Sequence, residues 1–238
     1  MNEQSNTPMS PMPDGPMAFY QVWTKALTKP NEQTFADLAA SPNAKAMSAY
    51  TWVFVASLIQ LFFSFLVNGS VMRQALENSG RGDLPLQGFA FTAVFSICGA
   101  PVGALIVTLF FAVGTAIIQW IAKMFGGSGT FDQLAYSFGA IQAPFALAST
   151  VFTMLGAIPF VGLCFRIVLS LLSLYVFVLQ VMATKGVNRF GWGQAFGSVL
   201  IPGAVIGITC CCLFAVAGAA GGFAIQDLIR QVPQGFGP

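Results

Sequence analysis

Long apolar stretches, separated by short polar segments, make up most of the chain. Five windows contain no Asp, Glu, Lys or Arg: 46–72, 84–122, 133–165, 167–184 and 190–226. A helix that crosses a bilayer needs about 20 mostly apolar residues, and each window is long enough for one. The apolar residues run continuously, whereas a membrane barrel would show apolar and polar residues in alternation. The pattern therefore predicts an all-α, polytopic membrane helical bundle with about five transmembrane helices.

The expected spans fall inside these windows, but the second window is too long for a single crossing. We place spans near 49–67, 100–122, 131–157, 161–184 and 194–223, with a connection from Gly69 to Gly88 after the first span, a bend at Pro144 and a kink at Pro202. A helix over 84–122 would be about 58 Å long, against a hydrocarbon core of about 30 Å. This window is either a surface segment followed by one span, or one long tilted helix. Two spans joined at Pro101 are least favoured, because a single proline often only kinks a membrane helix.

The residues before the first span divide into two parts. Residues 1–18 are rich in Pro, Ser, Asn and Met and show no periodicity, so we predict a disordered tail. Residues 19–45 are predicted to form one or two short amphipathic helices at the membrane interface, where aromatic and basic residues are common. In the second of these helices Thr34 is expected to act as the cap, and Phe35 and Leu38 share one face. A solvated linker is the alternative.

Composition and charge extend this picture to topology. Only 8% of the residues are charged, whereas a soluble domain has roughly 25%. Five spans place the N-terminal tail on the same side as the connections at 123–132 and 185–193, a side with six Lys or Arg against four on the other. Positive charge favours the cytoplasmic side. We expect a transmembrane domain over 46–225, a C-terminal tail over 226–238, and a cytoplasmic N-terminus in a prokaryotic inner membrane.

Groups that perform catalysis or bind metals are scarce. The chain has no His, and its five Cys lie in apolar windows, as small apolar residues do. No carboxylate lies inside the five windows, and Asp132, directly before the third window, is read as the start of a helix, where its charge suits the helix dipole. The glycine-rich segment after Phe125 lacks the Lys and the preceding strand of a phosphate-binding loop. We therefore predict no catalytic residues, no cofactor, no metal and no nucleic-acid partner.

One ionisable side chain lies among the apolar helices. Arg166 begins a polar stripe with Ser170, Ser173 and Gln180 at helical spacing. Charges in membrane helices are often functional, which favours a contact with an anionic headgroup or substrate. The alternative is that Arg166 lies about one turn inside the boundary and extends its guanidinium to the interface. Pairs of glycines four residues apart, such as Gly99 and Gly103, predict close helix packing and are compatible with homo-oligomers.

The chain resembles the Yip family of Ypt-interacting membrane proteins, in its prokaryotic branch. The most specific feature is the segment from Phe125 to Leu134, Phe-Gly-Gly-Ser-Gly-Thr-Phe-Asp-Gln-Leu, and Tyr136 and Pro144 follow it. The family motif residues matched here are Gly126, Gly127, Gly129, Thr130, Phe131, Leu134 and Pro144. Further support comes from Trp23, Pro30 and Thr34-Phe35 before the first span, from Ile158-Pro159, and from Gln194-Ala195. The resemblance covers roughly residues 19–223.

The resemblance implies five helical spans, a cytosolic N-terminus and no enzymatic activity. Eukaryotic relatives bind prenylated Rab-type GTPases, but their tail motif Asp-Leu-Tyr-Gly-Pro is missing here, so GTPase binding is not carried over. Three hypotheses follow. The favoured one is a membrane scaffold that binds lipid and another membrane or cytosolic protein. The alternative is a small transporter, channel or permease subunit, supported by interrupted helices and Arg166. A membrane enzyme is disfavoured, because acid–base and metal-binding groups are missing.

Overall fold

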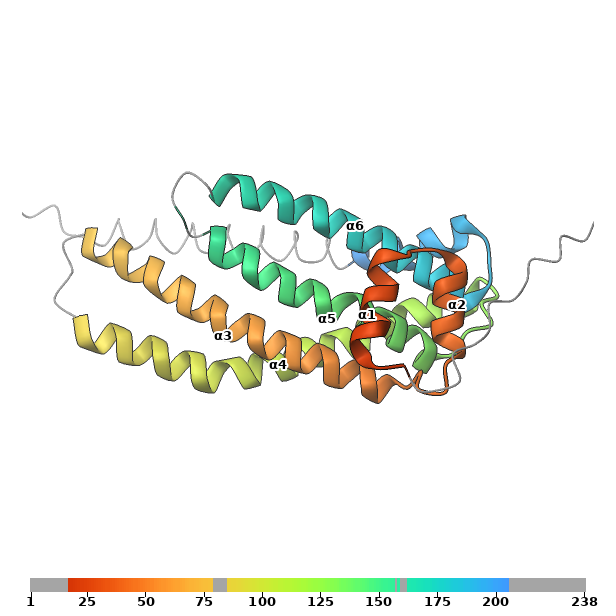
Figure 1. Cartoon of the computed structure of the whole chain (residues 1–238), viewed down its shortest axis with the longest axis horizontal. Helices are drawn as coiled ribbons and strands as arrows, with labels where there is room; N and C mark the ends of the chain where they lie inside the picture. The colour runs from red at the N-terminus through yellow and green to blue at the C-terminus, as the bar shows by residue number, and fades with distance from the viewer. Residues whose placement is uncertain (1–16, 79–84, 157, 159–161, 206–238) are drawn as a thin grey trace, which may run out of the picture.

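The computed structural model describes residues 17–78, 85–156, 158 and 162–205, without the side chains of 68–95. Every regular element in these residues is a helix, which confirms the all-α class (Figure 1). The helices are α1 (Phe19–Thr28), α2 (Glu32–Ala40), α3 (Ala46–Asn78), α4 (Pro85–Met124), α5 (Phe131–Gly156) and α6 (Gly162–Asn188). Residues 192–205 are also helical.

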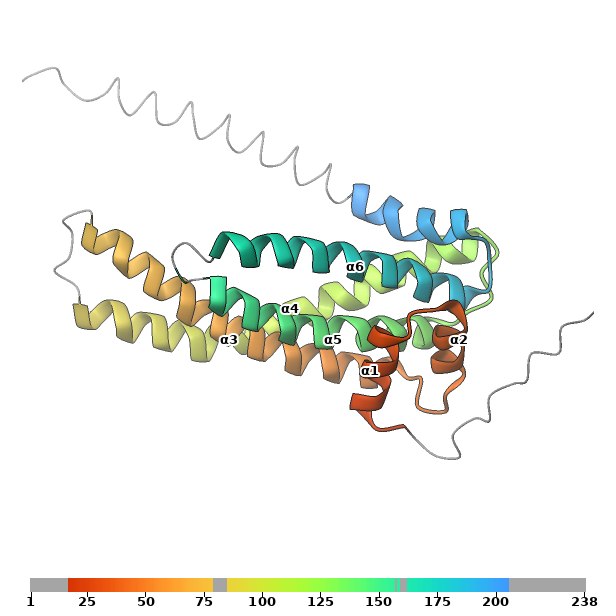
Figure 2. The same ribbon diagram turned by 45° about the horizontal axis from the view of Figure 1, so that its top comes forward.

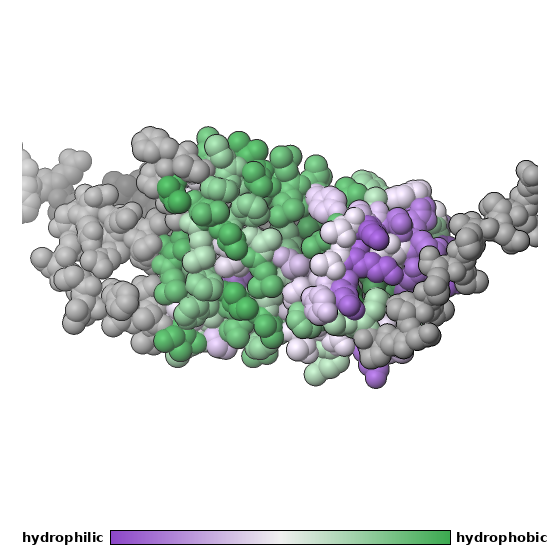
Figure 3. Space-filling view, viewed as in Figure 1, coloured by the Kyte–Doolittle hydropathy of each residue, from purple (hydrophilic) through white to green (hydrophobic). Residues whose placement is uncertain are grey.

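Four of the helices contain a segment that is long and apolar enough to cross a membrane. These segments are Ala46–Val67, Ser96–Met124, Phe131–Gly156 and Gly162–Asn188. Their exposed side chains form an apolar surface over the long helices, and hydrophilic side chains gather at the end that carries α1 and α2 (Figure 3). The predicted fifth span begins in the helical residues 192–205 and otherwise lies outside the described residues. The chain is therefore a polytopic helical membrane bundle.

The second apolar window is a single long helix. α4 has 40 residues and contains Pro101, which gives a length of about 60 Å. Of the alternatives left open by the sequence, the long helix is the one observed, and the hairpin at Pro101 is not. Proline removes one backbone donor from the helix, whereas a hairpin inside hydrocarbon would leave many backbone groups without partners.

Three local predictions were wrong. The connection expected from Gly69 to Gly88 is much shorter, because α3 continues to Asn78; one glycine disfavours a helix by only about 1 kcal/mol. The loop expected at 185–193 shrinks to 189–191, because α6 continues to Asn188. Thr34 does not cap α2. Its backbone N–H donates instead to Oδ1 of Asn31, at 2.6 Å, and Asn31 is the N-cap.

α5 lies at the centre of the bundle, between α3 and α6 (Figure 2). All residues from Leu134 to Ile141 are buried. Small residues allow α3 and α5 to approach closely: a Cβ atom on Gly139 would lie 2.7 Å from Cβ of Ala49. Helices in lipid associate through van der Waals packing of this kind, because burial from lipid supplies no hydrophobic driving force. This helix was expected over 131–157, and α5 runs from Phe131 to Gly156 with Pro144 inside it.

A polar contact joins α3 to α5 within the apolar region. Nε2 of Gln60 donates to Oγ of Ser149 at 2.8 Å. Ser149→Ala should lower the free energy of unfolding in detergent by about 0.6–2 kcal/mol, the range for hydrogen bonds between membrane helices. Thr153→Ala is the control, because the Thr153 hydroxyl bonds only to the carbonyl of Ser149 in its own helix. Equal losses in the two variants would show that the Gln60 contact contributes nothing.

Candidate functional site

The two N-terminal helices form a cap on one end of the bundle. We define the cap as residues 19–40 and the capped end as the cap together with the adjoining segments 41–45, 123–132 and 185–193. Figures 1 and 2 both place α1 and α2 at the end where α4 meets α5 and where α6 ends. The N-terminal helices therefore share one side with these segments, as the span count predicted. Which side of the membrane this is remains a prediction.

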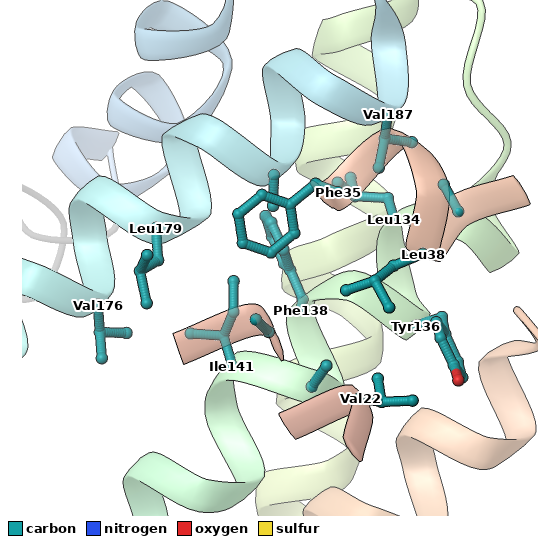
Figure 4. Close-up of a cluster of buried hydrophobic side chains, with 14 residues drawn as sticks. Val22, Phe35, Leu38, Leu134, Tyr136, Phe138, Ile141, Val176, Leu179 and Val187 are labelled. Atoms are coloured by element: carbon teal, nitrogen blue, oxygen red, sulfur yellow. The ribbon is translucent and has the colours of Figure 1, made fainter. Parts of the chain in front are cut away.

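An apolar core joins the cap to α5 and α6. Val22 and Ala26 of α1 and Phe35 and Leu38 of α2 are fully buried, which confirms that Phe35 and Leu38 share an inward face. Figure 4 shows these side chains meeting others from the bundle: Leu134, Tyr136, Phe138, Ile141, Val176, Leu179 and Val187. Burial of a large apolar side chain contributes about 1.5–3 kcal/mol. The cap is thus part of the folded core.

α2 lies directly against the last turns of α6. A Cβ atom on Gly186 would lie 2.5 Å from the carbonyl oxygen of Glu32 and 3.1 Å from Cβ of Phe35, so glycine is required there. Beside it, Lys185 forms an ion pair with Glu32. The same ammonium lies 4.2 Å from the centre of the Trp192 ring, at cation–π distance. Lys185 therefore joins the cap, α6 and the start of the next helix.

Two further contacts fix the cap and the chain that follows it. The Tyr175 hydroxyl donates to the carbonyl of Leu27 at 2.7 Å, which ties the end of α1 to α6. The backbone N–H of Ala46 donates to Oδ1 of Asp132 at 3.1 Å. Asp132 thus lies in the first turn of α5, as predicted, and also binds the first residue of α3. The end of α1 and the start of α3 are therefore both anchored to the bundle.

Buried amides hold the glycine-rich segment. Nε2 of Gln119 donates to the carbonyl of Gly129 at 2.7 Å and to Oδ1 of Asn188 at 3.0 Å. The backbone N–H of Ser128 donates to the carbonyl of Asn188 at 3.1 Å. A Cβ atom on Gly127 would lie 2.6 Å from Oδ1 of Asn188. The glycines therefore let the loop pass close to the end of α6, and Gln119 and Asn188 satisfy its polar groups.

The other residues of the predicted family motif lie around this loop. Gly126 has a φ of 87°, a conformation that favours glycine. Thr130 begins α5: Gln133 N–H donates to its hydroxyl at 3.4 Å, and Oε1 of Gln133 accepts from Thr130 N–H at 2.9 Å. Phe131 packs beside Ala46, Leu134 is buried under the cap, and Pro144 lies inside α5. These positions describe a structural segment that shapes the capped end.

Replacing the buried amides should destabilise the loop. Asn188→Ala leaves Oε1 of Gln119 without its donor, and an unsatisfied buried polar group costs about 1–3 kcal/mol. Unfolding in detergent should therefore show a loss of about 2 kcal/mol for Asn188→Ala. Gln119→Leu combined with Asn188→Leu should lose less than the sum of the two single leucine changes, because in the double variant neither of these two side chains is left as the unpaired partner of the other. Simple additivity would contradict coupling between the two side chains.

Basic groups are in excess at the capped end. The segments 19–45, 123–132 and 185–193 carry six Lys or Arg and three Asp or Glu. Two of the carboxylates form ion pairs, Glu32 with Lys185 and Asp37 with Lys25, the latter at 4.0 Å. Within the described residues of the capped end, four exposed cations have no ion pair: Lys29, Lys45, Lys123 and Arg189. This surface favours acidic partners or anionic headgroups.

The predicted polar stripe follows α6 from Arg166, in its first turns, toward the end that contacts the cap. All four side chains are on α6; Arg166, Ser170 and Ser173 are exposed, and Gln180 is half-buried. The Ser173 hydroxyl donates to the carbonyl of Leu169 in the same helix, at 2.8 Å. The role of this stripe remains a prediction. Within the described part of the chain, Cys98 and Cys164 are exposed free thiols, and no three His, Cys, Asp or Glu side chains are grouped as a metal site requires.

The chain is a polytopic integral membrane protein. It has four apolar helices with exposed apolar surfaces, and an N-terminal cap packs on one end of them. The family model described as the Yip1 domain matches residues 24–214, so the chain belongs to the Yip family. This family is a non-enzymatic family of membrane proteins. Comparison with curated proteins and with solved structures gave no significant match. The matched range includes residues 24–40 of the cap, the glycine-rich loop and all four candidate spans.

Proposed function

We propose that this protein is a non-enzymatic membrane scaffold that binds another membrane or cytosolic protein at its capped end. The observation that carries the proposal is the cap itself. Two short helices with fully buried Phe35 and Leu38 are packed on the bundle, and exposed cations without an ion pair, such as Lys29 and Arg189, lie at the same end. Helical and loop surfaces on a rigid frame suit protein binding.

Sidedness is part of the proposal. The excess of Lys and Arg at the capped end favours the cytoplasmic side of a prokaryotic inner membrane. Exposed Phe19 and Tyr20 on α1 extend the basic surface with aromatic side chains, which are enriched where proteins bind one another. An acidic, amphipathic segment of a partner protein has the matching chemistry.

The test is site-specific photocrosslinking in native membranes. A photoreactive amino acid replaces Lys29 at the capped end, and the control replaces Leu105, an exposed residue of α4 in the apolar region. We expect discrete protein adducts from position 29 and mainly lipid adducts from position 105. The same adducts from both positions would contradict a partner site at the capped end. Specific solute flux through liposomes containing only this protein would favour the transporter alternative instead.

A further inference from the structure

An apolar groove lies between α3 and α4 in the lipid-facing part of the bundle. It has a volume of about 390 Å³, within the range of small-ligand pockets. The α3 wall includes Ile59, Phe62 and Phe63, and the α4 wall includes Ile97, Ala100 and Pro101. Both walls fall inside candidate membrane spans. The groove is far from the hydrophilic capped end and belongs to neither the cap nor the glycine-rich loop.

Its shape follows from the residue sizes along α4. Ala100 is fully buried between the helices and has a small side chain, which leaves space against the phenylalanines of α3. One turn further on, a Cβ atom on Gly103 would lie 2.8 Å from Cδ1 of Leu61, so the helices are in tight contact there. The tight contact between α3 and α4 at Gly103 therefore closes one end of the groove.

We propose that this groove holds one acyl chain of a membrane lipid. Its rim is open to the exposed apolar surface of α4, where Ile97 and Leu105 are 63% and 60% exposed. At this depth the surrounding medium is hydrocarbon, so acyl chains are the molecules that reach the groove. The recess has no charged side chain to bind a polar solute. A chain that fills it gains van der Waals contacts on both walls, which an empty groove lacks.

The test uses the full-length protein in nanodiscs of phosphatidylethanolamine and phosphatidylglycerol, with a trace of a phospholipid carrying a diazirine midway along one acyl chain. After illumination, mass spectrometry locates the labelled residues. Ile97→Trp narrows the groove from its rim. Leu109→Trp is the matched control, because Leu109 is equally exposed, at 63%, on the same helix and does not line the groove. Ile59→Trp is a second variant that narrows the groove from α3.

We expect label in the segment 58–63 of α3. Ile97→Trp or Ile59→Trp should reduce this label about five-fold, and Leu109→Trp should leave it unchanged. A five-fold reduction corresponds to about 1 kcal/mol of binding free energy. Label spread evenly over the exposed faces of α4 and α6, or label unaffected by the rim substitutions, would overturn the proposal. Label at 58–63 that is present with one protein copy per nanodisc and lost with two copies would assign the groove to a second copy and also overturn it. The experiment is independent of the capped end, so its failure leaves the proposed partner site untouched.

Discussion

Phe35→Ala is expected to release the cap from the bundle while the long helices stay folded. The Phe35 side chain is fully buried among residues of α5 and α6, and removing a buried phenylalanine ring costs about 3–5 kcal/mol. The four long helices do not depend on this ring for their own contacts. Hydrogen exchange should therefore show lost protection in α1 and α2, with protection in α5 retained.

Phe19→Ala is the matched control for this change. Phe19 is in the same cap but is 54% exposed, and its ring contacts Trp23 and Tyr20 of its own helix. Its removal should change cap protection by less than about 1 kcal/mol, because surface substitutions have small effects. If Phe35→Ala left the exchange of α2 unaltered, the cap would not be held by its buried core.

Gly186→Leu should separate α2 from α6 by a different route. Any Cβ atom at this position meets the carbonyl oxygen of Glu32 at 2.5 Å, and that backbone atom moves only if α2 moves. Overpacking typically costs about 1–3 kcal/mol, and we expect the upper end here because backbone is the obstacle. Limited proteolysis in detergent should show faster cleavage between the cap and α3.

The control for this substitution is Gly193→Leu. Gly193 lies at the start of the next helix, and a Cβ atom there meets nothing within 4 Å. The same leucine should leave the proteolysis pattern unaltered. Matching cleavage rates for the two variants would mean that the α2–α6 contact tolerates a large side chain and is looser than the glycine position indicates.

The cap changes how the N-terminal segment of this chain is understood. Its helices were predicted at the membrane interface from aromatic and basic residues, and the structure shows a buried face as well as an exposed one. Because the buried face packs on α5 and α6, the exposed basic groups are held in fixed positions relative to the glycine-rich loop. A fixed arrangement of this kind reduces the entropic cost of binding a partner.

Local patterns predicted most of the helices. The apolar windows gave α3, α5 and α6, and the spacing of Phe35 and Leu38 gave the inward face of α2. The family motif pointed to the glycine-rich loop, because three glycines in four residues are unusual within an apolar chain. Pro144 was correctly placed inside a continuing helix, since membrane helices accommodate proline through their neighbours.

Contacts between residues far apart in the sequence explain the features that local patterns did not predict. Gln119 and Asn188 are 69 residues apart, and nothing in either local segment indicates that they pair. Gln119 is nevertheless a polar residue in an apolar window, and that signal could have identified it as a partner for another buried group. Lys185 and Gly186 were expected in the loop over 185–193, but both lie in α6. Their contacts with α2 instead extend α6 to Asn188.

The most direct test of the account is proximity labelling from the N-terminus in native membranes, comparing the unsubstituted protein with Phe35→Ala and with Leu105→Ala as the control. Both variants must first be shown to reach the membrane at equal levels. If the docked cap forms the partner site, one reproducible set of proteins is recovered with the unsubstituted protein and with Leu105→Ala, and is lost with Phe35→Ala. Recovery of the same set with Phe35→Ala would contradict a partner site built on the docked cap.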